Sequence, residues 1–188
     1  SVAKTTMGRR SFLLGAAAAS TVSTLAAPAI AKGDDAYEGK VIRTLEFVHN
    51  RTDERFKGVY WWEGEYQPEA LQRANWTLRD VNLDIGRDMD PGLLDFMYGI
   101  KQKMGKHEMV VTSAYRTKHT NDRLRRKNRL AARRSLHIEG QAVDFYSPKL
   151  YGSTIGKMAN SLEKGGVGRY KGRRFIHVDV GPVRTWYR

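Results

Sequence analysis

The chain contains no cysteine among its 188 residues. A disulfide framework is therefore excluded, so the folded domain must be held together by its core and by any metal ion that it binds. The same absence removes thiolates from the possible metal ligands and leaves His, Asp and Glu side chains. The sequence also shows no internal repeat, low-complexity linker or second domain, and its length suits one domain with a sizeable core.

Acidic residues are scarce relative to basic ones: 20 Asp and Glu stand against 33 Lys and Arg, for a formal net charge of +13. Such an excess favours a polyanionic partner or surface. The basic run over 123–129, followed by Arg133 and Arg134, is typical of a basic helix, and it is either a binding surface or a solvated face. No recognisable nucleic-acid-binding motif accompanies the run, so we expect no nucleic acid partner.

A long, strongly apolar run is also missing. Residues 13–27 carry no charge, but more than half of them are Ala, Ser or Thr, which is too weakly apolar for a stable membrane span. They follow the twin arginine Arg9-Arg10, and the small residues Ala29 and Ala31 suit signal peptidase. We therefore predict a twin-arginine signal peptide over 1–31, with a retained anchor as the competing interpretation.

Export by this route would place the mature chain in the periplasm or cell envelope. The segment 1–31 holds three basic and no acidic residues, which leaves 30 basic against 20 acidic residues, a net charge of +10. The polyanions of that compartment include the carboxylates of peptidoglycan stem peptides and the phosphates of lipids and teichoic acids. We expect a flexible leader over 32–40 and a monomeric domain over 41–188.

Periodicity and turn signals predict an α+β domain with helices packed on a mainly antiparallel sheet. The predicted strands cover 41–48, 58–62, 108–113, 141–146 and 174–180, and the predicted helices cover 68–79, 90–103, 120–134 and 153–163. In the second helix, Asp90 is the expected N-cap and Pro91 the first helical residue. The glycine-rich segment 165–168 indicates an unusual backbone. His49, His107 and His119 lie in polar contexts that predict ordinary loop histidines.

Two short segments carry the residues most typical of a metal site. His137 and Asp144 flank Gly140, so a turn entering the strand at 141 would bring both onto one ion. In a strand, residues two apart share a face, so His177 and Asp179 project together. Two histidines and one aspartate form a three-ligand set that leaves a coordination position open, as catalytic zinc sites do. Taken singly, His137 is equally typical of a surface or capping histidine, and Asp144 of an arginine partner.

The order of these motifs resembles the signature of the LAS metallopeptidases, a superfamily that includes lysostaphin-like enzymes, D-alanyl-D-alanine carboxypeptidases and the hedgehog domain. The matching segments are Ser113-Ala-Tyr-Arg-Thr117, Ser135-x-His137-x-x-Gly140-x-Ala142-x-Asp144 and His177-x-Asp179. Further segments from Arg43 to Trp186 are similar to the murein endopeptidase K branch of exported bacterial proteins, among them Asn75-Trp-Thr-Leu-Arg79-Asp80 and Gly181-Pro-Val-Arg184-x-Trp186.

This resemblance implies a zinc-dependent peptidase that hydrolyses amide bonds in peptidoglycan stem peptides or cross-links. It implies that His137, Asp144 and His177 hold the zinc ion, and that Arg116 faces a substrate carboxylate or carbonyl and stabilises the oxyanion. A structural salt bridge is the alternative role for Arg116. Tyr115 is expected to line the cleft, and Ser135 to contact substrate or support the metal loop.

The general base is left open by the sequence. Several relatives carry an acidic residue three positions before the last histidine, and Arg174 stands at that position here. Asp179 is the nearest acidic candidate, unless it only orients a metal ligand. Glu139 is the other candidate.

Two alternative functions follow from these features. The missing acid would permit a non-catalytic peptidoglycan-binding module that retains the peptidase fold. The basic run would suit a binding protein for anionic envelope polymers, with the metal incidental.

Overall fold

We analysed a computed structural model that describes residues 36–37, 40–127 and 132–188. The predicted signal peptide and most of the predicted leader lie outside these residues. Residues 34–188 form one compact unit. Within the described ranges, no helix is long and apolar enough to cross a bilayer.

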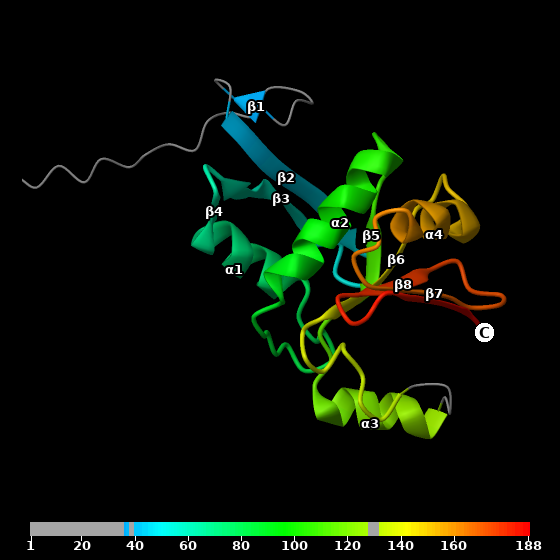
Figure 1. Cartoon of the computed structure of the whole chain (residues 1–188). Helices are drawn as coiled ribbons and strands as arrows, with labels where there is room; N and C mark the ends of the chain where they lie inside the picture. Colours follow the sequence, from blue (N-terminus) through cyan, green and yellow to red (C-terminus); the bar gives the residue numbers. More distant parts are fainter. Residues whose placement is uncertain (1–35, 38–39, 128–131) are drawn as a thin grey trace, which may run out of the picture. The chain divides into compact units, whose positions relative to one another are not determined.

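Along the chain, β1 to β4 come first and α1 and α2 follow; β5, α3, β6 and α4 then alternate before the last strands, β7 to β9 (Figure 1). The strands are β1 (Ala36–Tyr37), β2 (Lys40–His49), β3 (Arg55–Trp62), β4 (Glu65–Tyr66), β5 (Val110–Ser113), β6 (Ala142–Tyr146), β7 (Gly166–Arg169), β8 (Ile176–Asp179) and β9 (Arg184–Tyr187). The helices are α1 (Pro68–Thr77), α2 (Pro91–Met104), α3 (Lys118–Lys127) and α4 (Gly152–Asn160).

The strands form a sheet in the order β4-β3-β2-β5-β6-β8-β7-β9, with β1 paired to β2. Only the β2–β5 and β7–β9 pairings are parallel, and the other described pairings are antiparallel. The predicted α+β fold with a mainly antiparallel sheet is therefore confirmed. The predicted pairing of 41–48 with 58–62 is also confirmed, because β2 and β3 are antiparallel neighbours.

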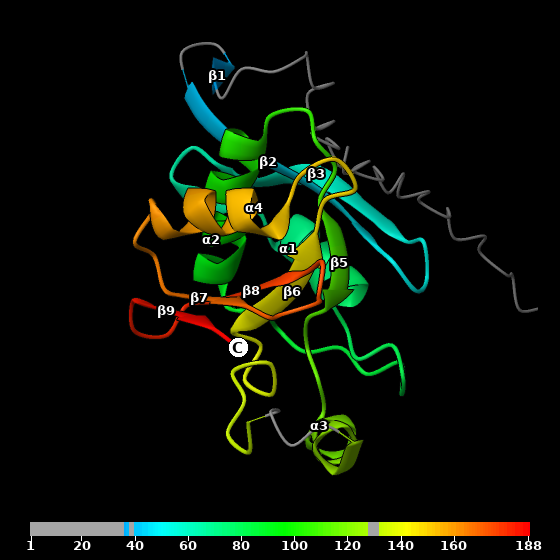
Figure 2. The ribbon, with the colours of Figure 1, turned by 90° about the vertical axis from the view of Figure 1, so that its right-hand side faces the viewer.

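Helices α2 and α4 pack against each other and against the sheet, whereas α3 stands away from it in both views (Figures 1 and 2). Leu93, Leu94, Phe96 and Met97 of α2 are fully buried. The side chain of Asp90 accepts a hydrogen bond from the Gly92 N–H at 2.9 Å, and Pro91 begins the helix, as predicted. The cap fixes where α2 starts, and α2 in turn covers the sheet.

Strands β6 and β8 have one apolar face and one polar face. Val143, Phe145, Ile176 and Val178 are fully buried in the core. Because strand residues alternate between the two faces, the residues between them project to the opposite side. The core therefore fixes the orientation of a polar row at the centre of the sheet, and this row carries the candidate site.

Several details of the predicted elements were wrong. The helix predicted over 120–134 begins at Lys118 and is described as far as Lys127; residues 132–134 are not helical, and 128–131 lie outside the described residues. Ala132, beyond this gap, accepts a hydrogen bond at its carbonyl from Asn121 Nδ2 at 3.1 Å. Strands β4 and β9 were not predicted.

The other two differences concern glycines and a histidine. Segment 165–168 has no positive φ angle and forms β7, so its glycines serve close packing and not an unusual backbone. A Cβ on Gly168 would lie 2.4 Å from the Trp186 ring. His49 is the last residue of β2, is only 1% exposed, and is not a loop histidine.

Candidate metal centre and its cleft

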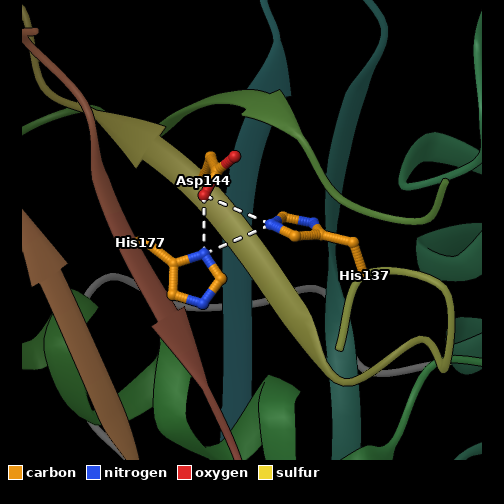
Figure 3. Close-up of side chains that lie close together, drawn as sticks. All are labelled: His137, Asp144 and His177. Atoms are coloured by element: carbon orange, nitrogen blue, oxygen red, sulfur yellow. Dashed lines mark hydrogen bonds and ion pairs between the residues drawn. The ribbon is translucent and has the colours of Figure 1, made fainter. Parts of the chain in front are cut away.

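Three side chains from two strands and one loop converge at the polar face of the sheet (Figure 3). Asp144 of β6 is directly opposite His177 of β8 in the antiparallel ladder, and such cross-strand neighbours share a face. His137 reaches them from the loop before β6. Asp144 Oδ1 lies 2.8 Å from His177 Nδ1 and 3.3 Å from His137 Nε2. One ligand atom from each of the three residues lies within 4.8 Å of the others, so this group can hold a metal ion.

In each imidazole, the outer nitrogen is the one that points away from Asp144, and it has a hydrogen-bond partner. His137 Nδ1 lies 2.6 Å from the Ala114 carbonyl oxygen, and His177 Nε2 lies 2.9 Å from Asp179 Oδ2. Each outer nitrogen can therefore carry the proton and donate it. The inner nitrogens, His137 Nε2 and His177 Nδ1, are then free to act as ligands. Bonds of this kind fix the tautomer and orientation of metal-binding histidines.

The loop that carries His137 is a compact turn held at both ends. The Ile138 N–H donates to the Ser135 carbonyl at 2.8 Å, and the Arg116 N–H donates to the His137 carbonyl at 3.1 Å. Gly140 has φ of +71°, and a Cβ there would lie 2.9 Å from the Asp88 carbonyl oxygen. Only glycine combines this conformation with so close an approach. The turn therefore places His137 firmly over Asp144.

Asp179 is fully buried and has both carboxylate oxygens bonded. Oδ1 accepts from the Gly181 N–H at 2.9 Å, and Arg184 donates to Oδ1 at 2.9 Å and to Oδ2 at 2.7 Å. This bidentate pair is the strong form of an Arg–carboxylate interaction. Asp179 thus lies behind His177, as a carboxylate that orients a ligand would lie.

The charges of the group are strongly coupled. Burial lowers the pKa of His137. Burial also acts to lower the pKa of His177, but hydrogen bonds to Asp144 and Asp179 outweigh it and raise the pKa to about 9. Burial acts to raise the pKa of Asp179, but hydrogen bonds from His177 and Arg184 lower it to about 2. Without a metal, the group therefore holds a proton on His177 at neutral pH.

The predicted substrate residues line the same cavity as the three ligands. This cavity has a volume of about 1510 Å³ and includes Tyr115, Arg116 and Ser135 among its lining residues. Arg116 is largely buried, its Nε has no hydrogen-bond partner, and its Nη2 lies 3.5 Å from Ser135 Oγ. Burial lowers the pKa of Arg116, and the nearby Asp144 carboxylate acts in the opposite direction.

The other two positions considered for the general base lie elsewhere. Glu139 is exposed and pairs with Arg87 at 3.5 Å. Arg174 is exposed, lies over the Tyr146 ring at 5.3 Å and donates to the Pro148 carbonyl at 3.4 Å. Neither residue lines the cavity.

Sequence reasoning missed Tyr170 and Trp186 as cavity residues. The Trp186 ring lies 5.3 Å from the His177 ring. The Tyr170 ring packs on Phe175 at 5.5 Å. The glycine-rich segment was the available signal, since a strand of glycines indicates that a bulky group approaches it closely.

A mainly antiparallel sheet that presents two histidines and an aspartate at one point in a large cleft defines a metal-dependent hydrolase. The sequence model of the peptidoglycan L,D-endopeptidase MepK family matches residues 37–186. The chain belongs to this family, which confirms the resemblance to the murein endopeptidase K branch and makes the chain a metallopeptidase that acts on peptidoglycan.

Curated relatives agree with the family match. The chain is 37% identical over 146 residues to the probable peptidoglycan L,D-endopeptidase MepK of Haemophilus influenzae. The aligned region covers 77% of this chain and 78% of the relative. It is also 37% identical over 146 residues to the peptidoglycan L,D-endopeptidase MepK of Escherichia coli K12, covering 77% and 79% of the two chains.

Proposed function

We propose that this chain hydrolyses an L,D amide bond in the stem peptides or cross-links of peptidoglycan, with a zinc ion held by His137, Asp144 and His177. The observation that carries the proposal is the convergence of His137 Nε2, Asp144 Oδ1 and His177 Nδ1 while both outer imidazole nitrogens are bonded elsewhere. The L,D assignment follows the names of the relatives in Haemophilus influenzae and Escherichia coli.

The donor set fits zinc. Two imidazole nitrogens and one carboxylate oxygen are usual zinc ligands, and the described residues add no fourth protein ligand to the group. A bound zinc ion would polarise the scissile carbonyl and lower the pKa of a coordinated water to about 7. The cleft residues would then bind the peptide, orient its carbonyl and stabilise the charge that develops.

Arg116 is the residue that we assign to the substrate. Its guanidinium lies in the cleft, and no carboxylate of the described chain forms an ion pair with it. A structural salt bridge, the alternative considered from the sequence, therefore has no partner among these residues. We assign the guanidinium to a carboxylate or carbonyl of the bound peptide, where charged donors stabilise an oxyanion.

Tyr115, Ser135, Tyr170 and Asp179 take supporting roles in this proposal. Tyr115 and Ser135 line the cleft beside Arg116 and contact substrate there. Burial raises the pKa of Tyr170, so its hydroxyl stays protonated and can donate a hydrogen bond into the cleft. Asp179 holds His177 in its ligand orientation, because both of its oxygens are already bonded. Asp179 is thus a positioning residue.

We further propose that the enzyme works in the periplasm or cell envelope, after residues 1–31 direct its export by the twin-arginine route. The supporting observations are Arg9-Arg10 ahead of an uncharged run and the cell-wall substrate named for the relatives. Secretion of a reporter fused to 1–31, compared with the same fusion carrying Arg9→Lys and Arg10→Lys, tests the route. Equal secretion of both fusions would exclude it.

The activity is tested by incubating zinc-loaded protein with isolated peptidoglycan, with and without chelator, and resolving the released muropeptides by mass spectrometry. New chelator-sensitive fragments ending at an L,D bond are expected. The His137→Ala variant should lose metal and activity together. Metal-loaded protein that binds sacculi but releases nothing would instead indicate the non-catalytic binding module.

A further inference from the structure

The basic helix and its surroundings form part of the cleft that contains the metal centre. Arg123, Leu124 and Lys127 of α3 line the cavity, followed by Arg134 from the segment after the helix. The connection between β7 and β8 adds Lys171 and Arg173. We call the five cations of this set, Arg123, Lys127, Arg134, Lys171 and Arg173, the cationic rim.

The rim residues have no acidic partner among the described residues, and each of them is exposed. The helix itself offers a contrast. Lys118 and Arg125 both pair with Asp122, at 2.6 Å and 3.8 Å, and neither lines the cavity. On α3, therefore, Lys118 and Arg125 outside the cavity share the carboxylate of Asp122, whereas Arg123 and Lys127, which line it, have no ion pair among the described residues.

The carboxylates that line the cavity do not balance the rim. Asp80 accepts hydrogen bonds from the Thr117 N–H and hydroxyl, at 3.0 Å and 2.8 Å. Asp144 belongs to the ligand group, and Asp179 is paired with Arg184. No other acidic residue of the described chain lines the cavity, so the cleft carries a net positive field that attracts anionic ligands.

The cationic rim lines the same cavity as the candidate metal ligands. This location favours a peptide substrate as the ligand of the rim over a polyanion that is not the substrate. The rim and the metal ligands share one cavity of about 1510 Å³, above the roughly 300–1,000 Å³ of a small-molecule pocket. An extended ligand fits such a space. Its anionic groups must then lie on the molecule that carries the scissile bond, and free carboxylates on stem peptides meet this condition. Arginine recognises such groups through two parallel hydrogen bonds.

We propose that the cationic rim binds the free carboxylates of peptidoglycan stem peptides on the parts of the substrate that extend beyond the scissile bond. This proposal rests on the proposed function, because it assumes that the metal site cuts the bound peptide. The rim acts on binding and on the choice of substrate. It does not take part in bond cleavage.

The test compares two double variants of α3 that remove the same charge. Arg123→Gln with Lys127→Gln removes two rim cations, whereas Lys118→Gln with Arg125→Gln removes two cations outside the cavity. Each zinc-loaded protein is assayed on cross-linked muropeptides with free stem carboxylates and on the same muropeptides after amidation. Binding of a fluorescent, uncross-linked stem peptide is measured by anisotropy in parallel.

Wild-type protein should prefer the free-carboxylate substrate, with KM rising about tenfold on amidation, which corresponds to about 1.4 kcal/mol. The rim variant should raise KM about tenfold on the free substrate, keep kcat and zinc content, and show little change on the amidated one. It should also bind the stem peptide about tenfold more weakly. The control variant should match wild type in all of these measurements.

Equal KM values for the rim variant and wild type, or equal losses on free and amidated substrates, would overturn the proposal. A rim variant that loses binding to teichoic acid but keeps its muropeptide KM and its stem-peptide affinity would also overturn it in favour of a phosphate polymer. If wild-type protein cleaves nothing, the proposed function fails. The anisotropy measurement then still decides whether the rim binds stem-peptide carboxylates.

Discussion

Arg116 is a cation held in the cleft with an unbonded Nε and no ion-pair partner among the described residues. We expect Arg116→Lys to keep the positive charge but lower kcat/KM by about 10²–10³, because an ammonium cannot reproduce the planar fork of the guanidinium. Zinc content, measured by atomic emission, should stay at the wild-type value. Normal activity of this variant would remove Arg116 from the substrate-binding residues.

Replacement of Asp179 distinguishes a role in positioning His177 from a role in proton transfer. Replacing it with Asn keeps the size of the side chain but removes the charge that faces His177 and Arg184. We expect zinc affinity, measured by competition with a chromophoric chelator, to fall by about 10–100-fold. At saturating zinc, kcat should recover most of its wild-type value if Asp179 only positions His177. A kcat that stays low at full zinc occupancy would instead place Asp179 in proton transfer.

At the scale of elements, β7 is the strand whose sequence is most constrained by its neighbours. A Cβ at Gly168 would lie 2.4 Å from the Trp186 ring, so Gly168→Ala should push the ring away from His177 and destabilise the fold by about 1–3 kcal/mol. Urea unfolding followed by tryptophan fluorescence measures both effects. Gly86→Ala is the matched control, since its nearest contact would be 3.8 Å away and it has no positive φ. Similar losses in both variants would show that the effect is not specific to β7.

Elements defined by local sequence signals could be predicted from the sequence. Elements defined by contacts between distant parts of the chain could not. The caps and apolar periodicity of α2 are local, so Asp90 and the helix bounds were predicted nearly to the residue. Strand β9 has exposed or partly exposed side chains and is held by its parallel pairing with β7, which is not a local property. The glycines of β7 were recognised as unusual, but their cause is the bulk of Trp186 and the proximity of Asp179.

The site was predictable for a related reason. The resemblance to a family pointed to His137, Asp144 and His177 as the proposed ligand set, and the structure brings these three residues together. The partners behind the ligands were less accessible. The Ala114 carbonyl that bonds His137 is a backbone group, and nothing in a residue's identity marks the use of its carbonyl. Arg184, which pairs with Asp179, appeared in the resemblance only as a matching position.

At the scale of the whole molecule, the metal-free protein should lose stability as pH rises above neutrality. His177 has a folded pKa of about 9, above its ordinary value of 6.5. A raised pKa gives stability that is fully present below about pH 6.5 and is lost as pH rises through about 9. Burial lowers the pKa values of His137 and His49, so their contribution to stability rises as pH passes through about 6.5, and they add no slope above about pH 7.5.

Thermal unfolding of chelator-treated protein between about pH 7.5 and 9.5, where only His177 among these histidines titrates, measures this effect. We expect Tm to fall across the window for the metal-free wild type. The zinc-loaded protein should show a much smaller fall, because the metal takes the place of the His177 proton. A flat profile for the metal-free protein would show that His177 is not protonated in the folded state.

The ligand group is built from parts of unequal rigidity. Asp144 and His177 are neighbours in a sheet ladder, whereas His137 arrives on a turn held by a few hydrogen bonds around Gly140 and Ala114. Asp144 and His177 alone would offer two ligands to the proposed zinc ion, so retention of the ion would depend on the backbone of that one turn. Gly140 has a positive φ there, and replacing it should weaken zinc retention even where the equilibrium fold survives.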